Sequence, residues 1–318
     1  MTGLGWTLAS RALRRPIRRI LTQVARGFLM GAADVVPGVS GGTVALVLGI
    51  YERLVANIRG GAGALGALAT GQVSTALGRL RHLEWGWLLS LGVGIAVAVV
   101  SLAHTIETLL EEQPVRTAAL FFGLIAGSVV LAWRLVRLRD LKRVSVAGAA
   151  AVAAFFVLGL GSGPVDDPSW WMFLGAGAVA ICAMILPGVS GSFLLLMLGM
   201  YDSVLGLVTD RDLAVLGVFA VGGVVGLALF STALHWALAA HHDTVLAAMV
   251  GLMLGSLRVL WPWPDGTDSS TLATPADDVV VPVLIAVAAT AVVLVTTFVA
   301  GRSSGEHPAF TGRSSNGA

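Results

Sequence analysis

A short helix-breaking sequence occurs twice inside apolar stretches of this 318-residue chain. Residues 37–43 read PGVSGGT, and residues 187–193 read PGVSGSF. Proline removes a backbone donor and glycine weakens a helix, so each apolar segment is expected to break at the motif. Aligned without a gap, residues 31–52 (GAADVVPGVSGGTVALVLGIYE) and 181–202 (ICAMILPGVSGSFLLLMLGMYD) repeat at an offset of 150 residues. The chain therefore contains a duplicated unit with a broken helix in each copy.

A second pair of related stretches extends the duplication over most of the chain. Residues 121–133 (FFGLIAGSVVLAW) match residues 249–261 (MVGLMLGSLRVLW). Hydrophobic residues make up 56% of the sequence and charged residues only 12%, whereas soluble domains carry about 25% charge. This composition indicates an integral membrane protein.

Six uninterrupted apolar runs approach the length of a membrane span. A spanning helix needs ~20 residues to cross ~30 Å of hydrocarbon at about 1.5 Å per residue. The two PGVSG segments add two further hydrophobic units. The six runs are residues 85–103, 117–133, 144–161, 213–234, 244–260 and 279–300.

Each broken segment either crosses the membrane or enters and leaves on one side. The positive-inside rule, which favours Lys and Arg in cytoplasmic loops, discriminates between these topologies. With re-entrant segments and a cytoplasmic N-terminus, all but three of the 20 Lys and Arg residues lie inside; Arg116, Arg211 and Arg258 lie outside. A crossing first segment would instead place the basic loops 53–81 and 134–143 outside. Re-entrant hairpins are therefore predicted.

The predicted fold is an all-α integral membrane protein made of two inverted repeats. Each repeat is a re-entrant helical hairpin followed by three transmembrane helices. Repeat 1 covers 27–161, with its hairpin at 27–50 and a cytoplasmic amphipathic stretch at 53–84 that is expected to lie on anionic lipids. Repeat 2 covers 171–300, with its hairpin at 171–201. A basic cytoplasmic segment, 1–26, precedes the repeats, and a disordered cytoplasmic tail, 301–318, follows them.

The hairpin tips are the predicted binding site for an anion. A turn at membrane depth must face protein or a polar cavity, because unpaired amides in lipid cost several kcal/mol each. The outgoing helix presents free N–H groups and about half a positive charge, which suit a phosphate. Arms of about ten residues span ~15 Å, so the two tips can meet at the midplane. The predicted break residues are Pro37, Gly38, Pro187 and Gly188, and the predicted phosphate ligands at the tips are Ser40, Gly41, Gly42, Thr43, Ser190, Gly191 and Ser192.

These motifs resemble those of PopT-type polyprenyl-phosphate transporters, a bacterial membrane family once classed as a domain of unknown function. The resemblance rests on the two PGVSG segments, FFGLIAGS and GLMLGSLRVLWP, and covers about 26–262. It implies a flippase that returns undecaprenyl phosphate, the lipid carrier of cell-wall precursors, from the outer to the inner leaflet. It also implies a location in the bacterial cytoplasmic membrane, where both termini are expected to face the cytoplasm.

Three charged residues outside the motif are further candidates. Asp34 lies three residues before Pro37, and Met184 takes its place in the second copy. It is interpreted either as a coupling site for a proton or Na⁺ or as a structural hydrogen-bond acceptor. Arg258, with Arg116 as a second candidate, could receive the outer phosphate through a bidentate hydrogen bond or could merely extend to the interface.

Other functions are less well supported by the sequence. The basic excess is too small to suggest nucleic acid, and no His, Cys or acid spacing suggests a metal site or cofactor. A polyprenyl-pyrophosphate phosphatase would need an arginine and paired carboxylates, but Gly41 and Gly191 stand where the arginine is expected, so no enzyme activity is predicted. A small-ion channel or transporter would share the broken helices and remains an alternative function. Each break could also serve only as a kink or a close helix contact, or could form a cation site from its carbonyls. The sequence leaves the oligomeric state and the coupling ion undetermined.

Overall fold

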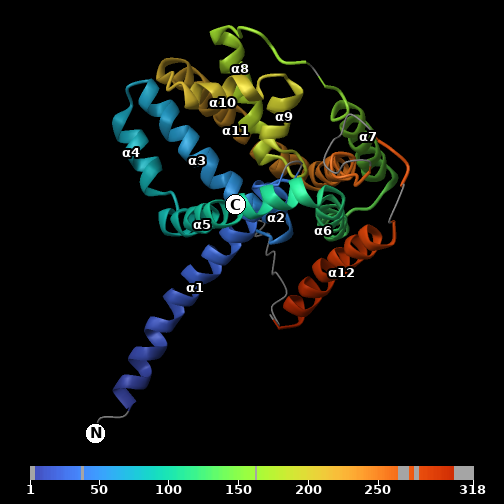
Figure 1. The fold of residues 1–318 in the computed structure, drawn as a ribbon. Helices are drawn as coiled ribbons and strands as arrows, with labels where there is room; N and C mark the ends of the chain where they lie inside the picture. The colour runs from blue at the N-terminus through green and yellow to red at the C-terminus, as the bar shows by residue number, and fades with distance from the viewer. Residues whose placement is uncertain (1–3, 37–38, 162, 264–271, 276–278, 304–318) are drawn as a thin grey trace.

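The computed structural model describes residues 4–36, 39–161, 163–263, 272–275 and 279–303 (Figure 1). Over these residues the chain forms helices and no strand, as the composition predicts. Pro37 and Gly38, two of the predicted break residues, lie outside the described part. The helices are α1 (Leu4–Asp34), α2 (Gly41–Val47), α3 (Tyr51–Ala69), α4 (Val73–Arg81), α5 (Trp85–Glu112), α6 (Pro114–Leu135), α7 (Leu141–Val157), α8 (Trp170–Ile185), α9 (Gly191–Met197), α10 (Tyr201–Thr209), α11 (Leu213–Ser256) and α12 (Val280–Ser303).

The apolar runs of the sequence are helical. Of the described helices, α5, α6 and α11 are long and apolar enough to cross a membrane, and α8 and the described part of α12 are shorter apolar helices. Two predicted runs, 213–234 and 244–260, belong to the single 44-residue element α11. Its only non-helical position is His241, with φ −139° and ψ 44°, so a kink lies between the two runs.

Both PGVSG units break the helix and start a short new one. In the first unit α1 ends at Asp34 and α2 begins after Ser40; in the second, α8 ends at Ile185 and α9 begins after Ser190. α2 and α9 have seven residues each, fewer than the ten expected for an outgoing arm. Each short helix ends early because a glycine that follows it, Gly49 (φ +68°) in the first copy and Gly199 (φ +66°) in the second, has a left-handed backbone conformation that terminates a helix.

The stretch 53–84 differs from a single amphipathic helix. It forms α3 and α4, which pack side by side and are connected at Thr70–Gln72, where Gly71 has φ +75°. α3 also packs on α11. The chain thus adds a helical pair before the first long apolar helix, α5 (Figure 1).

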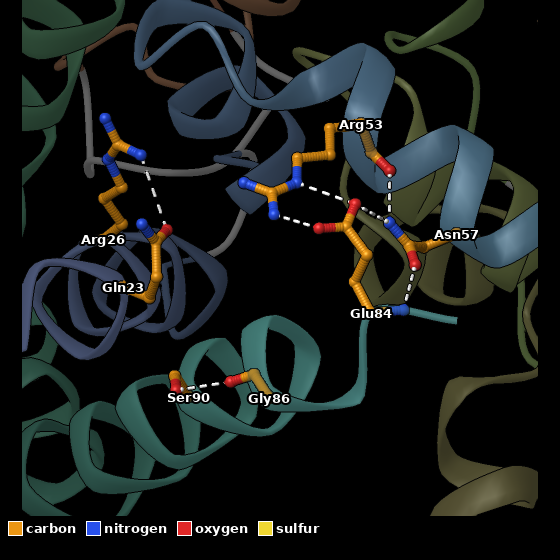
Figure 2. Close-up of polar contacts among 7 residues, drawn as sticks. All are labelled: Gln23, Arg26, Arg53, Asn57, Glu84, Gly86 and Ser90. Carbon is orange, nitrogen blue, oxygen red and sulfur yellow. Dashed lines mark hydrogen bonds and ion pairs between the residues drawn. The ribbon is translucent and has the colours of Figure 1, made fainter. Parts of the chain in front are cut away.

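A polar cluster fixes α3 to the beginning of α5 (Figure 2). The Arg53 guanidinium forms an ion pair with Glu84 and lies 4.5 Å from the Trp87 ring centre. The side chain of Asn57 accepts from the Glu84 backbone N–H at 3.0 Å and donates to the Arg53 carbonyl at 2.9 Å. The hydrogen bond from Arg53 holds the pKa of the Glu84 carboxyl below its usual value. The cluster therefore orients Arg53 at the base of α3.

Glycines let two pairs of helices approach closely, in the same way in both copies. Gly27 on α1 and Gly177 on α8 stand at equivalent positions, 150 residues apart. A Cβ on Gly27 would collide with the carbonyl of Leu91 on α5, and a Cβ on Gly177 would collide with the carbonyl of Phe219 on α11. The contact of α1 with α5 thus matches that of α8 with α11.

A second set of glycines joins helices from different halves of the chain. Gly123 on α6 lies against the carbonyl of Ala286 on α12, and the equivalent Gly251 on α11 lies against the carbonyl of Ala147 on α7. The pairs α6–α12 and α7–α11 are among the most extensive helix contacts in the molecule. Each half therefore completes its packing with helices of the other half.

We expect Gly177→Ala to destabilise the protein and Gly175→Ala to have little effect. The added methyl group at position 177 has to displace the backbone of α11, and overpacking of this kind costs about 1–3 kcal/mol. Gly175, on the same helix, has no neighbouring atom within 4 Å of the place that a Cβ would take, so it is a matched control for the change in helix propensity. Thermal unfolding of the detergent-purified variants measures the difference; equal stability would contradict the close packing of α8 on α11.

Candidate functional site

The two PGVSG segments contact each other at the centre of the molecule. The Thr43 hydroxyl accepts a hydrogen bond from the Gly188 backbone N–H at 2.9 Å. The Ser40 hydroxyl donates to the carbonyl of Leu186 at 3.2 Å. Ser40 and Thr43 are each only 1% exposed, and Pro187 is fully buried. The expectation that the two segments meet is confirmed by these hydrogen bonds.

Tyr51 extends this contact from the other end of α2. Its hydroxyl donates to the carbonyl of Ile185 at 3.0 Å, and its side chain is 2% exposed. Gly42 faces the same carbonyl, since a Cβ there would lie 2.8 Å from the oxygen. Tyr51 is not among the residues predicted for the site. Its repetition as Tyr201 was the available signal, but Tyr201 is 38% exposed, so the two tyrosines do not play equal parts.

The segments sit against the main hydrophobic core. That core includes Val36 and Val39 beside the first break, Ile185 beside the second, and Met249 and Met253 of α11. Gly188 has φ +85° and lies directly on Met253, where a Cβ would come within 2.7 Å of the Cα atom. A glycine is therefore required at this position by both its conformation and its close approach to α11.

A carboxylate already occupies the start of α2. Asp34 Oδ1 accepts a hydrogen bond from the Gly41 backbone N–H at 2.6 Å, and the Ser40 hydroxyl accepts one from the Gly42 N–H at 3.1 Å. The predicted structural role of Asp34 is thus present in the geometry. An anion at this tip would have to compete with Asp34 for the same N–H group.

The start of α9 is arranged differently. Met184 stands where the first copy has Asp34, and within the described residues no side chain forms a capping hydrogen bond at Ser190. The hydroxyls of Ser190 and Ser192 lie 2.9 Å apart, with Ser190 buried and Ser192 exposed. Of the two predicted tips, the tip of α9 therefore holds the accessible hydroxyl group and no resident carboxylate.

The two candidate arginines lie on different helices. Arg258 follows α11, half-buried against α7, with its guanidinium carbon 4.7 Å from the Phe155 ring centre. The next residue, Val259, packs in one cluster with Phe193 of α9. Arg116 is exposed in the first turn of α6. The structure brings Ser40, Thr43 and Gly188 together, and it places Arg258 on the side of α9.

Comparison with known proteins identifies the family. Residues 30–276 match the model of a family described as undecaprenyl phosphate translocase-like. The chain belongs to this family. A relative in Vibrio cholerae serotype O1, named polyprenyl-phosphate transporter, is 41% identical over 251 residues, covering 77% of this chain and 79% of the relative. A Staphylococcus aureus protein with the same name is 29% identical over 259 residues, covering 75% and 85%.

The undecaprenyl phosphate translocase-like match agrees with the resemblance found in the sequence motifs, and it spans both PGVSG segments. The two relatives are named as transporters and not as enzymes, in agreement with the expectation that this chain is not an enzyme. Within the described residues, no group of three or more His, Cys, Asp or Glu side chains could hold a metal ion. No solved structure matches the chain.

We expect Thr43→Val to destabilise the contact between the two segments, and Thr43→Ser to preserve it. Valine has the shape of threonine but leaves the buried Gly188 N–H without its acceptor, which costs about 1–3 kcal/mol. Serine keeps the hydroxyl. The comparison requires thermal unfolding of both variants in detergent, and a Thr43→Val protein as stable as Thr43→Ser would show that this hydrogen bond is dispensable.

Proposed function

We propose that this chain is a transporter of polyprenyl phosphate that returns undecaprenyl phosphate from the outer to the inner leaflet of the bacterial cytoplasmic membrane. The observation that carries the proposal is the family match over both PGVSG segments, together with 41% identity to a protein named polyprenyl-phosphate transporter. The long apolar helices α5, α6 and α11 supply a membrane-embedded body. The isoprenoid tail can then stay in the hydrocarbon of the surrounding bilayer while the protein shields the phosphate.

The proposed architecture is two inverted repeats, each beginning with a re-entrant hairpin. The matching contacts of Gly27 and Gly177, and of Gly123 and Gly251, support a repeated packing unit. The uneven distribution of Lys and Arg along the chain supports the inversion, with both termini in the cytoplasm. Inverted repeats with broken helices that meet near the midplane are a recurring plan of alternating-access transporters.

The phosphate is proposed to bind at the hairpin tips. In alternating access, the phosphate would reach the tips from one side of the membrane and leave them toward the other. Ser192 and the first turn of α9 are the better-supported half of this site, since Asp34 occupies the equivalent N–H at α2. Arg258 is proposed to guide the phosphate toward α9, and Arg116 to act at the outer surface.

Asp34 is proposed to couple transport to a proton or Na⁺. Its carboxylate lies beside the tip, where a bound phosphate would repel it, and a cation that neutralises the carboxylate would remove that repulsion. Binding of the cation and of the phosphate would then favour each other. At this position the second copy has Met184 and no carboxylate, so a single coupling site is expected per chain.

We expect Ser192→Asp to block transport while Ser192→Asn supports it. An aspartate in the first turn stabilises a helix, so the fold should persist, but its charge at the tip of α9 repels a phosphate and should lower transport by roughly tenfold or more. Asparagine has the same shape without the charge. The readout is the leaflet exposure of undecaprenyl phosphate in cells depleted of this protein and of redundant transporters.

The outcomes of that experiment are distinct. Outward accumulation that is rescued by wild type and Ser192→Asn, but not by an equally abundant Ser192→Asp protein, supports both the transport and the site. No accumulation on depletion would overturn the proposed function. Rescue by Ser192→Asp would be consistent with the proposed function but would overturn the proposed phosphate site at the tip of α9.

We expect Asp34→Asn to uncouple transport without unfolding the protein. The asparagine oxygen can still accept from the Gly41 N–H, so the cap is retained while the charge is removed. Asp34→Ala removes the cap as well and should cost about 0.5–2 kcal/mol of stability. Transport into proteoliposomes with and without an imposed proton or Na⁺ gradient measures the coupling; an Asp34→Asn protein that still responds to the gradient would assign Asp34 a structural role only.

A further inference from the structure

A cavity of about 800 Å³ opens at the C-terminal end of α2, opposite the tip. We call it the basic cavity, because three arginines from different parts of the chain line it: Arg53 on α3, Arg134 on α6, and Arg137 in the segment that follows α6. Leu46 of α2 and Gly49 line the side nearest the hairpin. Since α2 has seven residues, the cavity lies about 10 Å along the helix from the tip.

Hydrogen bonds between three elements hold the walls of the basic cavity in place. His242, beside the kink of α11, lies 2.8 Å from Glu52 of α3 and 3.2 Å from Asp243. Asp243 in turn accepts hydrogen bonds from the backbone N–H groups of Arg137, at 3.3 Å, and Leu138, at 3.0 Å. The kink at His241 thus connects the start of α3 with the chain that follows α6.

The charge of the lining is predominantly positive. Arg53, Arg134 and Arg137 contribute three guanidinium groups, and among the described lining residues Glu52, which faces His242, contributes the one carboxylate. Glu84, which does not line the cavity, accepts hydrogen bonds from Arg53 Nε and one terminal nitrogen, so Arg53 can donate to a phosphate only through its remaining N–H groups. Guanidinium groups bind phosphate oxygens in pairs through parallel N–H groups, and a phosphate monoester offers several such oxygens. The volume is in the range of small-molecule sites.

An apolar groove of about 570 Å³ shares the lining residue Arg134 with the basic cavity. It lies between α6, α7 and α11, and its two charged lining residues among the described ones are Arg134 and Arg139. Below these arginines the groove is lined by Val129, Val130, Val144, Ala147, Val250 and Leu254. A ligand that fits both spaces has an anionic head and a branched or linear apolar tail.

We propose that the basic cavity is a second binding site for the lipid phosphate, separate from the hairpin tips. The phosphate lies between Arg134 and Arg53, and the first isoprenoid units lie in the apolar groove below Arg134. This inference rests on the proposed function, because it takes a polyprenyl monophosphate as the ligand. The cavity holds the headgroup on the side of the membrane where most basic residues gather, either after its passage past the tips or before it.

The test is photo-crosslinking with a polyprenyl monophosphate that carries a diazirine on its first isoprenoid unit. The wild-type chain in nanodiscs is illuminated, and the labelled peptides are mapped by mass spectrometry. We expect labels on the groove residues of α6, α7 and α11. Arg134→Gln should reduce groove labelling roughly tenfold, because a charge-assisted hydrogen bond is lost, and Arg134→Lys should reduce it less.

Lys142→Gln is the matched control. It removes one positive charge from the start of α7, but Lys142 lines neither space and should leave the labelling unchanged. An excess of inorganic phosphate should not displace the probe if the tail contributes to binding. Displacement by inorganic phosphate alone would overturn the lipid assignment and leave a site for free phosphate.

The remaining outcomes separate this inference from the proposed function. Labels confined to α2, α8 and α9 would overturn the second site but would keep the chain as a polyprenyl-phosphate binder. An absence of any specific label on a correctly folded protein would count against the proposed function itself. An equal loss of groove labelling in Arg134→Gln and Lys142→Gln would show that labelling depends only on the general surface charge. This result would also overturn the second site.

Discussion

The fold depends on how side chains of the first interrupted helix satisfy the backbone of the second. Each PGVSG unit leaves N–H and C=O groups without helical partners in an apolar interior, where an unpaired group costs about 1–3 kcal/mol. The second unit supplies the Gly188 N–H to Thr43, and its carbonyls at Ile185 and Leu186 receive Tyr51 and Ser40. The first unit satisfies its own Gly41 and Gly42 N–H groups through Asp34 and Ser40. The contact between the two units fixes the positions of α2 and α9 and thereby of the helices packed around them.

The two units share a backbone design but differ in charge. Asp34 brings a carboxylate to the start of α2, and Met184 brings none to the start of α9. The same framework therefore combines a resident anion at one tip with an uncharged side chain at the other. The difference lies in one side chain, while the close approach of Gly27 to α5 and of Gly177 to α11 is the same in both copies.

The sequence predicted the parts of the structure that depend on local chemistry. Apolar runs predicted helices, and the duplicated Pro and Gly residues predicted where the helices break. Both predictions depend only on residues close together in the sequence. The lengths of α2 and α9 were overestimated since Gly49 and Gly199 were treated as part of a helix. The partners of Thr43 and Tyr51 lie more than 130 residues away, so no local pattern could identify them.

Charged residues show the same limit. In the sequence, Arg53, Arg134 and Arg137 indicate only a side of the membrane, and no pattern reveals that they line one cavity. Their convergence depends on the kink at His241 and on the hydrogen bonds of Asp243. Neither feature has a distinctive sequence signal, because His-His-Asp within a helical run also reads as an ordinary polar interruption.

The exchange of helices between the two halves bears on how such a chain could have arisen. α6 packs on α12 and α7 packs on α11, so a chain with only one copy of the unit would expose the faces that these partners cover. A single-copy chain could cover them only by pairing with a second molecule of itself. Fusion of the two genes would then have preserved an existing interface and allowed Asp34 and Met184 to diverge.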